Sequence, residues 1–265
     1  MSQALAELYL TLSRAFLAPD NEEAWVAMRD ALADDLDELG VVLGHDIAGP
    51  VAGYRGSIAA IPDQASLLQI YSALFLAPPR PVVINTGAYL DGVVNGGSVL
   101  AMEEEYRRWG VERNDGFKDL SDHVSIQLEF IAHLYGCGAT AKDVSEDRPD
   151  AAAEEFLQSY VARWLPPFLR DLESQHERLD GLDNPWRHLA RVLRVLVPLD
   201  AGRGEPHGHA RGEITAADIA VIARKLREQG LTTDHLPLPP GQSEDGQRFP
   251  TPGTASPYRG FRPAG

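Results

Sequence analysis

DLSDHVSIQLEFIAHLY, residues 119–135, is the stretch that decides the fold. Its apolar residues recur every three or four positions, on a main stripe that runs from Val124 to Tyr135. This period predicts an amphipathic helix, and Asp119 is the expected N-cap. A helix of this length buries its apolar stripe against other elements, so the stretch predicts a helical core.

The same run also carries polar groups that need an explanation. Asp122, Glu129 and His133 share one stripe at 100° per residue, and His123 lies beside it. Neighbours on a helix do not face each other, so Asp122 is poorly placed to orient His123 as a general base. The two histidines are ten residues apart, and the spacing of a metal motif such as H-E-x-x-H is missing. We therefore predict no catalytic residue and no metal ligand, and favour a structural role for these groups on spacing alone.

The helical period recurs along the chain, while strand-like alternation does not. Helices are expected near 1–16, 21–39, 63–77, 98–109, 151–165, 168–175, 184–199 and 215–229, with a weaker candidate at 46–60. The fold class is therefore predicted as all-α, a bundle of roughly ten helices. The expected organisation is an N-terminal lobe at 1–109, a linker at 110–120, a C-terminal lobe at 121–200, an extension at 201–236 containing the 215–229 helix, and a flexible or surface-draped tail at 237–265. The linker would permit either a monomer or a lobe-swapped dimer.

Composition narrows the functional classes. The 265 residues include 24 Lys+Arg and 39 Asp+Glu, a formal charge of −15, which argues against nucleic acid or an anionic membrane as the partner. A single cysteine, Cys137, excludes an internal disulfide and a cysteine-based zinc site. The N-terminus has no basic region ahead of its apolar residues, and no apolar run is long enough to span a membrane. We expect a cytoplasmic protein.

A second informative stretch is YSALFLAPPRPVVINTGAYLDG, residues 71–92. The apolar stripe of Tyr71, Leu74 and Phe75 is compatible with a simple core. The prolines that follow it fix an extended backbone beside the end of an apolar helix, and such an edge suits a peptide groove.

Taken in order, five stretches resemble the TorD/DmsD/NarJ family of redox-enzyme maturation chaperones. They are YSALFLAPPRP (71–81), AYLDG (88–92), EEEYRRWGV (103–111), the 119–135 run, and FLQSYVARWLPPFLRDL (156–172). The resemblance covers roughly residues 1–200 and is strongest to chaperones of the type II dimethyl-sulfoxide-reductase-like molybdoenzymes. Many relatives have a Pro-Trp pair shortly before Tyr89, where this chain reads VINTGAY.

The resemblance implies an all-helical protein that is not an enzyme and that works without a cofactor of its own. Its implied role is to hold the apo catalytic subunit of a molybdoenzyme, usually by a twin-arginine leader, until the molybdopterin cofactor is inserted. The leader-binding residues that it implies are Leu74, Phe75, Pro78, Tyr89, Asp122 and His123. In this picture Asp122 pairs with a leader arginine, Leu74, Phe75 and Tyr89 line an apolar groove, and His123 is a hydrogen-bonding wall residue.

Two alternatives stay open at this point. One is a helical adaptor that binds a folded partner through its acidic surface. The other is a hydrolase built on His123, Asp122 and Glu129. The groove hypothesis requires Asp122 and Phe75 to be close together and accessible to solvent. The identity of the client, and whether it carries a leader, cannot be read from the sequence.

Overall fold

The structure is a computed structural model that describes residues 1–202 except 79, 94, 112–118, 141–147 and 176–182. The helix expected at 215–229 and the tail at 237–265 lie outside the described residues, as does most of the 110–120 linker. Residues Met1–Pro206 form one compact unit.

The all-α prediction is confirmed. The helices are α1 (Ser2–Ala15), α2 (Glu22–Val26), α3 (Leu32–Leu43), α4 (Ala48–Ala59), α5 (Gln64–Tyr71), α6 (Gly87–Asp91), α7 (Gly97–Arg108), α8 (Val124–Thr140), α9 (Pro149–Phe156), α10 (Ala162–Ser174) and α11 (Pro185–Ala201). Three π-helical turns join α2 to α3, extend α5, and join α9 to α10, at Ala27–Ala31, Ser72–Leu76 and Leu157–Val161. Within the described residues, the β-type pairing is limited to one isolated bridge.

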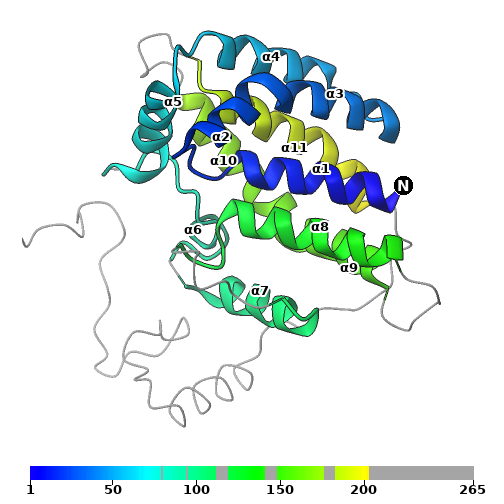
Figure 1. The fold of residues 1–265 in the computed structure, drawn as a ribbon. Helices are drawn as coiled ribbons and strands as arrows, with labels where there is room; N and C mark the ends of the chain where they lie inside the picture. The colour runs from blue at the N-terminus through cyan, green and yellow to red at the C-terminus, as the bar shows by residue number, and fades with distance from the viewer. Residues whose placement is uncertain (79, 94, 112–118, 141–147, 176–182, 203–265) are drawn as a thin grey trace, which may run out of the picture. The chain divides into compact units, whose positions relative to one another are not determined.

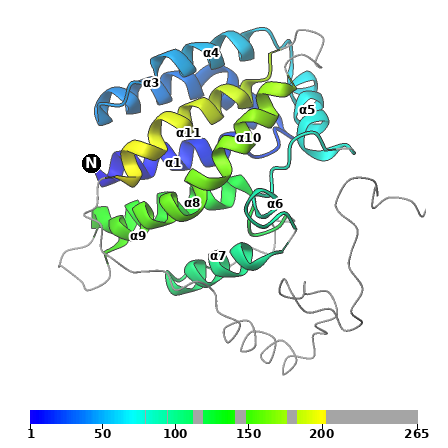
Figure 2. The ribbon, with the colours of Figure 1, turned by 180° about the vertical axis from the view of Figure 1, so that it is seen from behind.

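Helix α1 lies between α3 and α8, and α11 packs against α4 and α10 (Figures 1 and 2). The buried residues of α1 include Leu8 and Leu12, which share one core with Leu128 and Ile131 of α8. Helices from both expected lobes therefore contribute to a single core, and the contacts do not separate 1–109 from 121–200. None of the helices described is long and apolar enough to cross a membrane.

Aromatic rings from α10, α11 and the π-helical turn at 72–76 fill one part of the core. Phe75 packs between Phe168, at 6.4 Å between ring centroids, and Trp186, at 5.8 Å. The Trp186 Nε1–H donates to the carbonyl of Ala15 at 3.0 Å, so the ring is fixed at its polar edge as well. Edge-to-face and offset ring contacts of this kind add to the free energy gained from burial.

A buried polar cluster links the first and last described helices. The Tyr9 hydroxyl of α1 donates to Asp200 Oδ2 of α11 at 2.9 Å, and His45 Nε2 lies 2.9 Å from Asp200 Oδ1. All three side chains are buried. Burying the Asp200 carboxylate without partners would cost free energy of folding, so its two contacts must be kept. They therefore fix α11 relative to α1 and to the turn after α3.

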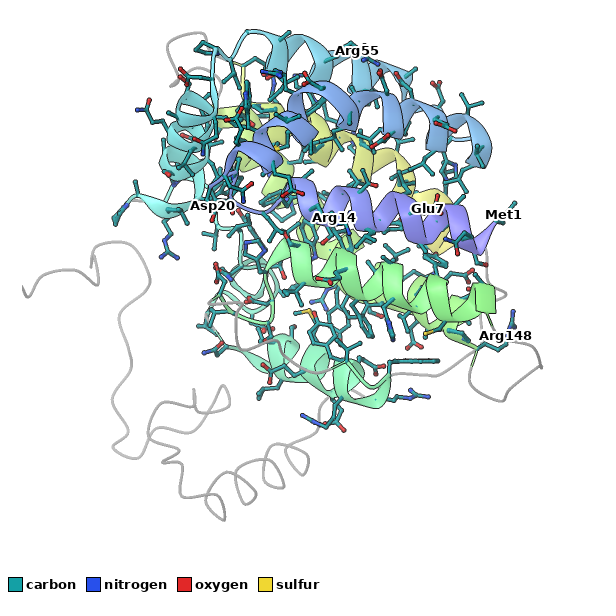
Figure 3. The ribbon with its side chains drawn as sticks, viewed as in Figure 1. Met1, Glu7, Arg14, Asp20, Arg55 and Arg148 are labelled. Atoms are coloured by element: carbon teal, nitrogen blue, oxygen red, sulfur yellow. The ribbon has the colours of Figure 1, made fainter. Side chains whose placement is uncertain are left out.

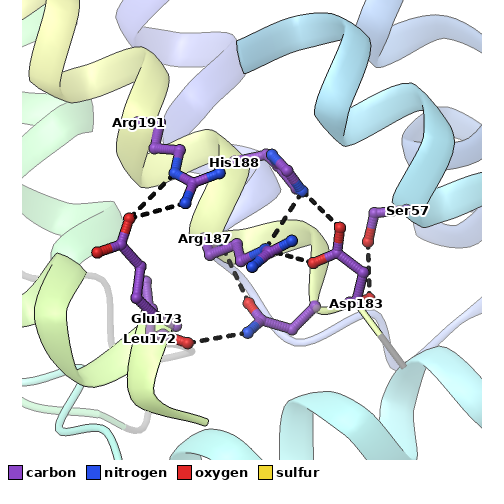
Figure 4. Close-up of polar contacts among 8 residues, drawn as sticks. Ser57, Leu172, Glu173, Asp183, Arg187, His188 and Arg191 are labelled. Atoms are coloured by element: carbon purple, nitrogen blue, oxygen red, sulfur yellow. Dashed lines mark hydrogen bonds and ion pairs between the residues drawn. The ribbon is translucent and has the colours of Figure 1, made fainter. Parts of the chain in front are cut away.

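A second polar cluster holds α4 against the start of α11 (Figure 4). Asp183 Oδ2 lies 2.7 Å from His188 Nε2, and its backbone carbonyl accepts from the Ser57 hydroxyl at 2.7 Å. The ring of His188 rests on Gly53, where an added Cβ would lie 2.3 Å from Nδ1. Gly53 therefore permits the close approach of the two helices.

The outer surface of α1, α3 and α4 is charged (Figure 3). Glu7 and Arg14 are exposed on α1, and Arg55 of α4 reaches Asp34 and Asp37 of α3 at 2.7 Å each. These exposed pairs contribute little to stability, but they keep that face hydrated.

Candidate functional site

The two motifs from the sequence meet at a short antiparallel pairing. The Thr86 N–H donates to the carbonyl of Asp122 at 3.1 Å, and the Val124 N–H donates to the carbonyl of Ile84 at 3.1 Å. Asn85 and His123 form the bridge between the two segments. We call residues 84–87 and 119–124, with the side chains bonded to them, the junction. It places the 71–92 stretch directly against the start of α8.

Asp122 is at the centre of the junction. Its Oδ2 accepts from the Gly87 N–H at 2.8 Å, and its Oδ1 accepts from Asn85 Nδ2 at 3.3 Å. The carboxylate therefore caps the N-terminus of α6, with a side chain that is 0% exposed. Burial raises the pKa of Asp122, and the bonds from Gly87 and Asn85 act in the opposite direction.

His123 directly precedes α8 and takes the role that the sequence assigned to Asp119. Its carbonyl accepts from the Gln127 N–H at 3.3 Å, and its Nδ1 accepts from the Ser125 N–H at 3.1 Å. The ring is 3% exposed, and burial lowers the pKa of His123 to about 4, against the opposing effect of Asp119. The ring is therefore neutral at pH 7. Asp119 instead bonds to Leu120 N and Asn85 Nδ2, at 2.7 and 3.0 Å.

Gln127 connects the junction to α10. Its Nε2 donates to Thr86 Oγ1 at 2.6 Å and to the carbonyl of Asp122 at 2.9 Å, while its Oε1 accepts from Trp164 Nε1 at 2.9 Å. Gln127 and Trp164 are fully buried. The sequence interpretation overlooked this glutamine, although an amide within an otherwise apolar stretch of helix was the pattern that could have revealed it.

The accessible part of the site is formed by Tyr89 and Asp171. The Tyr89 hydroxyl donates to Asp171 Oδ2 at 2.8 Å and accepts from the Val83 N–H at 3.2 Å. Its ring meets Phe168 edge-on at 6.1 Å, so α6 and α10 are joined at this point. Tyr89 and Asp171 are both half-buried, and Pro78 is exposed. Asp171 was missed from the sequence, although it lies in the 156–172 stretch.

Four of the six predicted leader-binding residues are not accessible in this structure. Leu74 and Phe75 are each 1% exposed and belong to the core, and Asp122 and His123 are enclosed in the junction. The requirement that Asp122 and Phe75 face solvent is therefore not met. The pairing with residues 84–86 covers Asp122 and His123 ahead of α8, whereas Leu74 and Phe75 are covered by the hydrophobic core. These four side chains hold the site in shape, whereas Tyr89 and Pro78 lie at its surface.

The arrangement of these groups does not resemble a hydrolytic or metal site. His123 has its Nδ1 bonded to the backbone, and among the described residues no group of three or more His, Cys, Asp or Glu side chains could hold a metal ion. The described residues define an all-helical protein with a buried polar junction and a half-open Tyr89–Asp171 pair beside it.

Comparison with known proteins identifies the family. The sequence profile of the nitrate reductase delta subunit family matches residues 4–170, well over half of the chain. The chain belongs to this family.

Individual proteins similar to this chain include two chaperones and one solved structure. A protein named chaperone protein TorD from Vibrio cholerae (El Tor Inaba N16961) is 30% identical over 109 residues, 40% of this chain, and the match spans about half (49%) of that relative. The Photobacterium profundum TorD chaperone is 21% identical over 184 residues, 65% of this chain and 83% of the relative. A crystal structure of an Archaeoglobus fulgidus protein assigned to redox enzyme maturation has a TM-score of 0.44 and 17% identity, over 72% of this chain and 93% of that one.

Proposed function

We propose that this protein is a cytoplasmic chaperone for the apo catalytic subunit of a molybdopterin-dependent oxidoreductase. It binds the twin-arginine leader of that subunit and holds the subunit until the cofactor is inserted. The family assignment and the chaperone names of its relatives support the general role.

The observation that carries the leader hypothesis is the Tyr89–Asp171 pair. Asp171 uses Oδ2 for the Tyr89 hydroxyl, and no described residue bonds to its Oδ1, so one carboxylate oxygen is free to accept from a guanidinium. Asp119, also half-buried, lies at the edge of the junction, where its Oδ1 accepts from Asn85 Nδ2 and the Leu120 N–H. In this proposal Asp171 takes the place that the sequence gave to Asp122, and Tyr89 and Pro78 contact the apolar part of the leader.

Leu74, Phe75, Asp122 and His123 remain part of the proposed site as positioning residues. Phe75 stacks on Phe168, whose ring supports Tyr89, and Asp122 fixes the first turn of the helix that carries Tyr89. Substitution of Phe75 or Asp122 would therefore disturb leader binding by displacing Tyr89, although neither side chain contacts solvent appreciably.

Isothermal titration with a synthetic twin-arginine leader tests the proposal. Losing a charged partner should weaken binding by about 1.5–3 kcal/mol in Asp171→Ala. Asp35→Ala is the matched control, because Asp35 is an exposed aspartate on α3 and its loss changes the net charge equally. A leader with both arginines replaced by glutamine should bind as weakly to the wild type as the native leader binds to Asp171→Ala.

Two results would count against the proposal. If Asp171→Ala and the wild type bind the leader with equal affinity, the Tyr89–Asp171 pair is not the leader site. Failure of the wild type to bind any leader would favour the adaptor alternative, in which the partner is recognised through its folded surface.

A further inference from the structure

A groove of about 350 Å³ lies between α10 and α11, the two packed helices labelled in Figure 2. Its apolar lining consists of Ala162, Leu165, Pro166, Leu169, Val197 and Pro198. The volume lies in the range of ligand-binding pockets, which is about 300–1,000 Å³. None of these residues takes part in the junction or in the Tyr89–Asp171 contact.

Both walls of the groove carry a proline inside a helix. Pro166 lies within α10 and Pro198 within α11. Neither can donate to the carbonyl four residues earlier, which belongs to Ala162 in α10 and to Arg194 in α11. Each wall therefore holds a backbone acceptor that lacks its usual intrahelical donor, next to an apolar surface.

The groove is also positively charged, in a chain of formal charge −15. Its charged lining residues are Arg170, Glu173 and Arg194, and Glu173 Oε1 accepts from Arg191 at 2.9 Å (Figure 4). No carboxylate of the described residues pairs with Arg170 or Arg194, and both are exposed. Two guanidinium groups thus flank the apolar surface with no neutralising partner in the part of the chain that the structure describes.

We propose that this groove binds an extended acidic segment of a partner protein, with apolar side chains in the groove and carboxylates on Arg170 and Arg194. Backbone N–H groups of an extended segment match the acceptors on Ala162 and Arg194, since such a segment has no internal hydrogen bonds. Carboxylates complement the two guanidinium groups in charge.

This surface is separate from the leader site, because Arg170 faces the groove while the adjacent Asp171 bonds to Tyr89 of α6. Under the proposed chaperone function, the segment belongs to the client outside its leader. The groove itself does not depend on that function, so the two proposals fail independently.

Fluorescence anisotropy of a labelled short peptide of alternating leucine and glutamate tests the groove. We expect saturable binding to the full-length protein, with affinity lowered about tenfold or more in Arg170→Glu/Arg194→Glu. Ala162→Trp should abolish binding, because it fills the groove from an exposed position and removes no core contact. Arg163→Glu, an exposed charge reversal on the same helix outside the lining, should bind like the wild type.

Each opposite result overturns the proposal. A leucine–lysine peptide that binds as tightly as the glutamate peptide would remove the charge argument, and unchanged binding by Ala162→Trp would place the peptide elsewhere. A further contrary result is that decanoate displaces the peptide and binds more tightly than the peptide does. That result would assign the groove to a small amphiphile. Leader titration of Ala162→Trp distinguishes the two sites, because this uncharged change in the groove should retain wild-type leader affinity.

Discussion

The carboxylate of Asp122 accepts a hydrogen bond from the Gly87 N–H at 2.8 Å, across 35 residues of sequence. This contact sets the spacing between the start of α6 and the segment before α8. It also limits what position 87 can hold, since an added Cβ would lie 2.7 Å from Val99 Cγ2 and 2.8 Å from Asp122 Oδ2.

Gly87→Ala should therefore destabilise the protein by about 1–3 kcal/mol, as expected for overpacking in a tight site. Urea unfolding followed by circular dichroism measures the change. Gly97→Ala is the matched control, because a Cβ at position 97 meets open space at the start of α7. Equal stability of the two variants would show that the approach of Gly87 to Asp122 is looser than the structure describes.

Gln127→Leu should also be destabilising, because it leaves the buried Trp164 N–H without its acceptor. An unpaired buried donor alone costs about 1–3 kcal/mol, and the lost bonds to Thr86 and the Asp122 carbonyl add to this. Gln69→Leu, at an exposed position of α5, should change the unfolding free energy by less than about 0.5 kcal/mol. A Gln127→Leu protein as stable as Gln69→Leu would rule out the proposed role of this amide.

The lowered pKa of His123 should make the stability of the protein depend on pH. Burial lowers the pKa of His123 to about 4 from the ordinary histidine value of about 6.5, so the unfolded chain takes up a proton first as the pH falls. Above pH 6.5 the neutral ring makes its full contribution to the free energy of unfolding. Between pH 6.5 and 4 this contribution is lost, and the free energy of unfolding falls by roughly 3 kcal/mol. The raised pKa of Asp122 acts with the opposite sign.

His123→Asn isolates this effect, because asparagine can still accept from the Ser125 N–H but does not titrate. The unfolding free energy of the variant should fall less steeply than that of the wild type between pH 7 and pH 4.5, with the Asp122 contribution common to both. His133→Asn, at an exposed position of α8, is the control and should follow the wild-type curve. Parallel curves for all three proteins would mean that His123 titrates normally.

Gly53→Ala should loosen the contact between α4 and α11, since its Cβ would lie 2.3 Å from His188 Nδ1. We expect a loss of about 1–3 kcal/mol from overpacking, measured as a lowered urea midpoint at constant slope. Gly56→Ala, one turn further along the same helix with open space around its Cβ, should be neutral or stabilising. A stabilised Gly53→Ala protein would contradict the packing of His188.

The sequence predicted the helices well where apolar residues repeat regularly, as in α1 and α8. It underestimated α4 because the glycines and Pro50 lower helix propensity there. Tertiary packing outweighs that penalty, since Val51, Tyr54 and Ile58 are buried on one face. The helix expected to end at Gly40 continues to Leu43, and Gly44 at φ +70° ends it instead.

The site was harder to predict for a different reason. Helical spacing gave Asp122 a place on a helix, but its backbone is held in the bridge to 84–86, which is a contact distant in sequence. Burial of Asp122 and exposure of Asp171 depend on how α6 and α10 pack together, and periodicity carries no information about that. The resemblance pointed to stretches that the structure brings together at the junction, while the structure decided which side chains within them reach the surface.

The hydrogen bond from Tyr9 to Asp200 also bears on how the chain is made, because it joins residues 191 positions apart. At about 5–20 residues per second, a ribosome needs roughly 10–40 s after adding Tyr9 before Asp200 is added. During that time α1 lacks both α8 and α11 for part of the interval, and its buried face has no complete partner. A nascent chain of this protein therefore leaves the α8-facing side of its first helix uncovered until α8 has been synthesised, and it leaves Tyr9 without its Asp200 partner until α11 is complete.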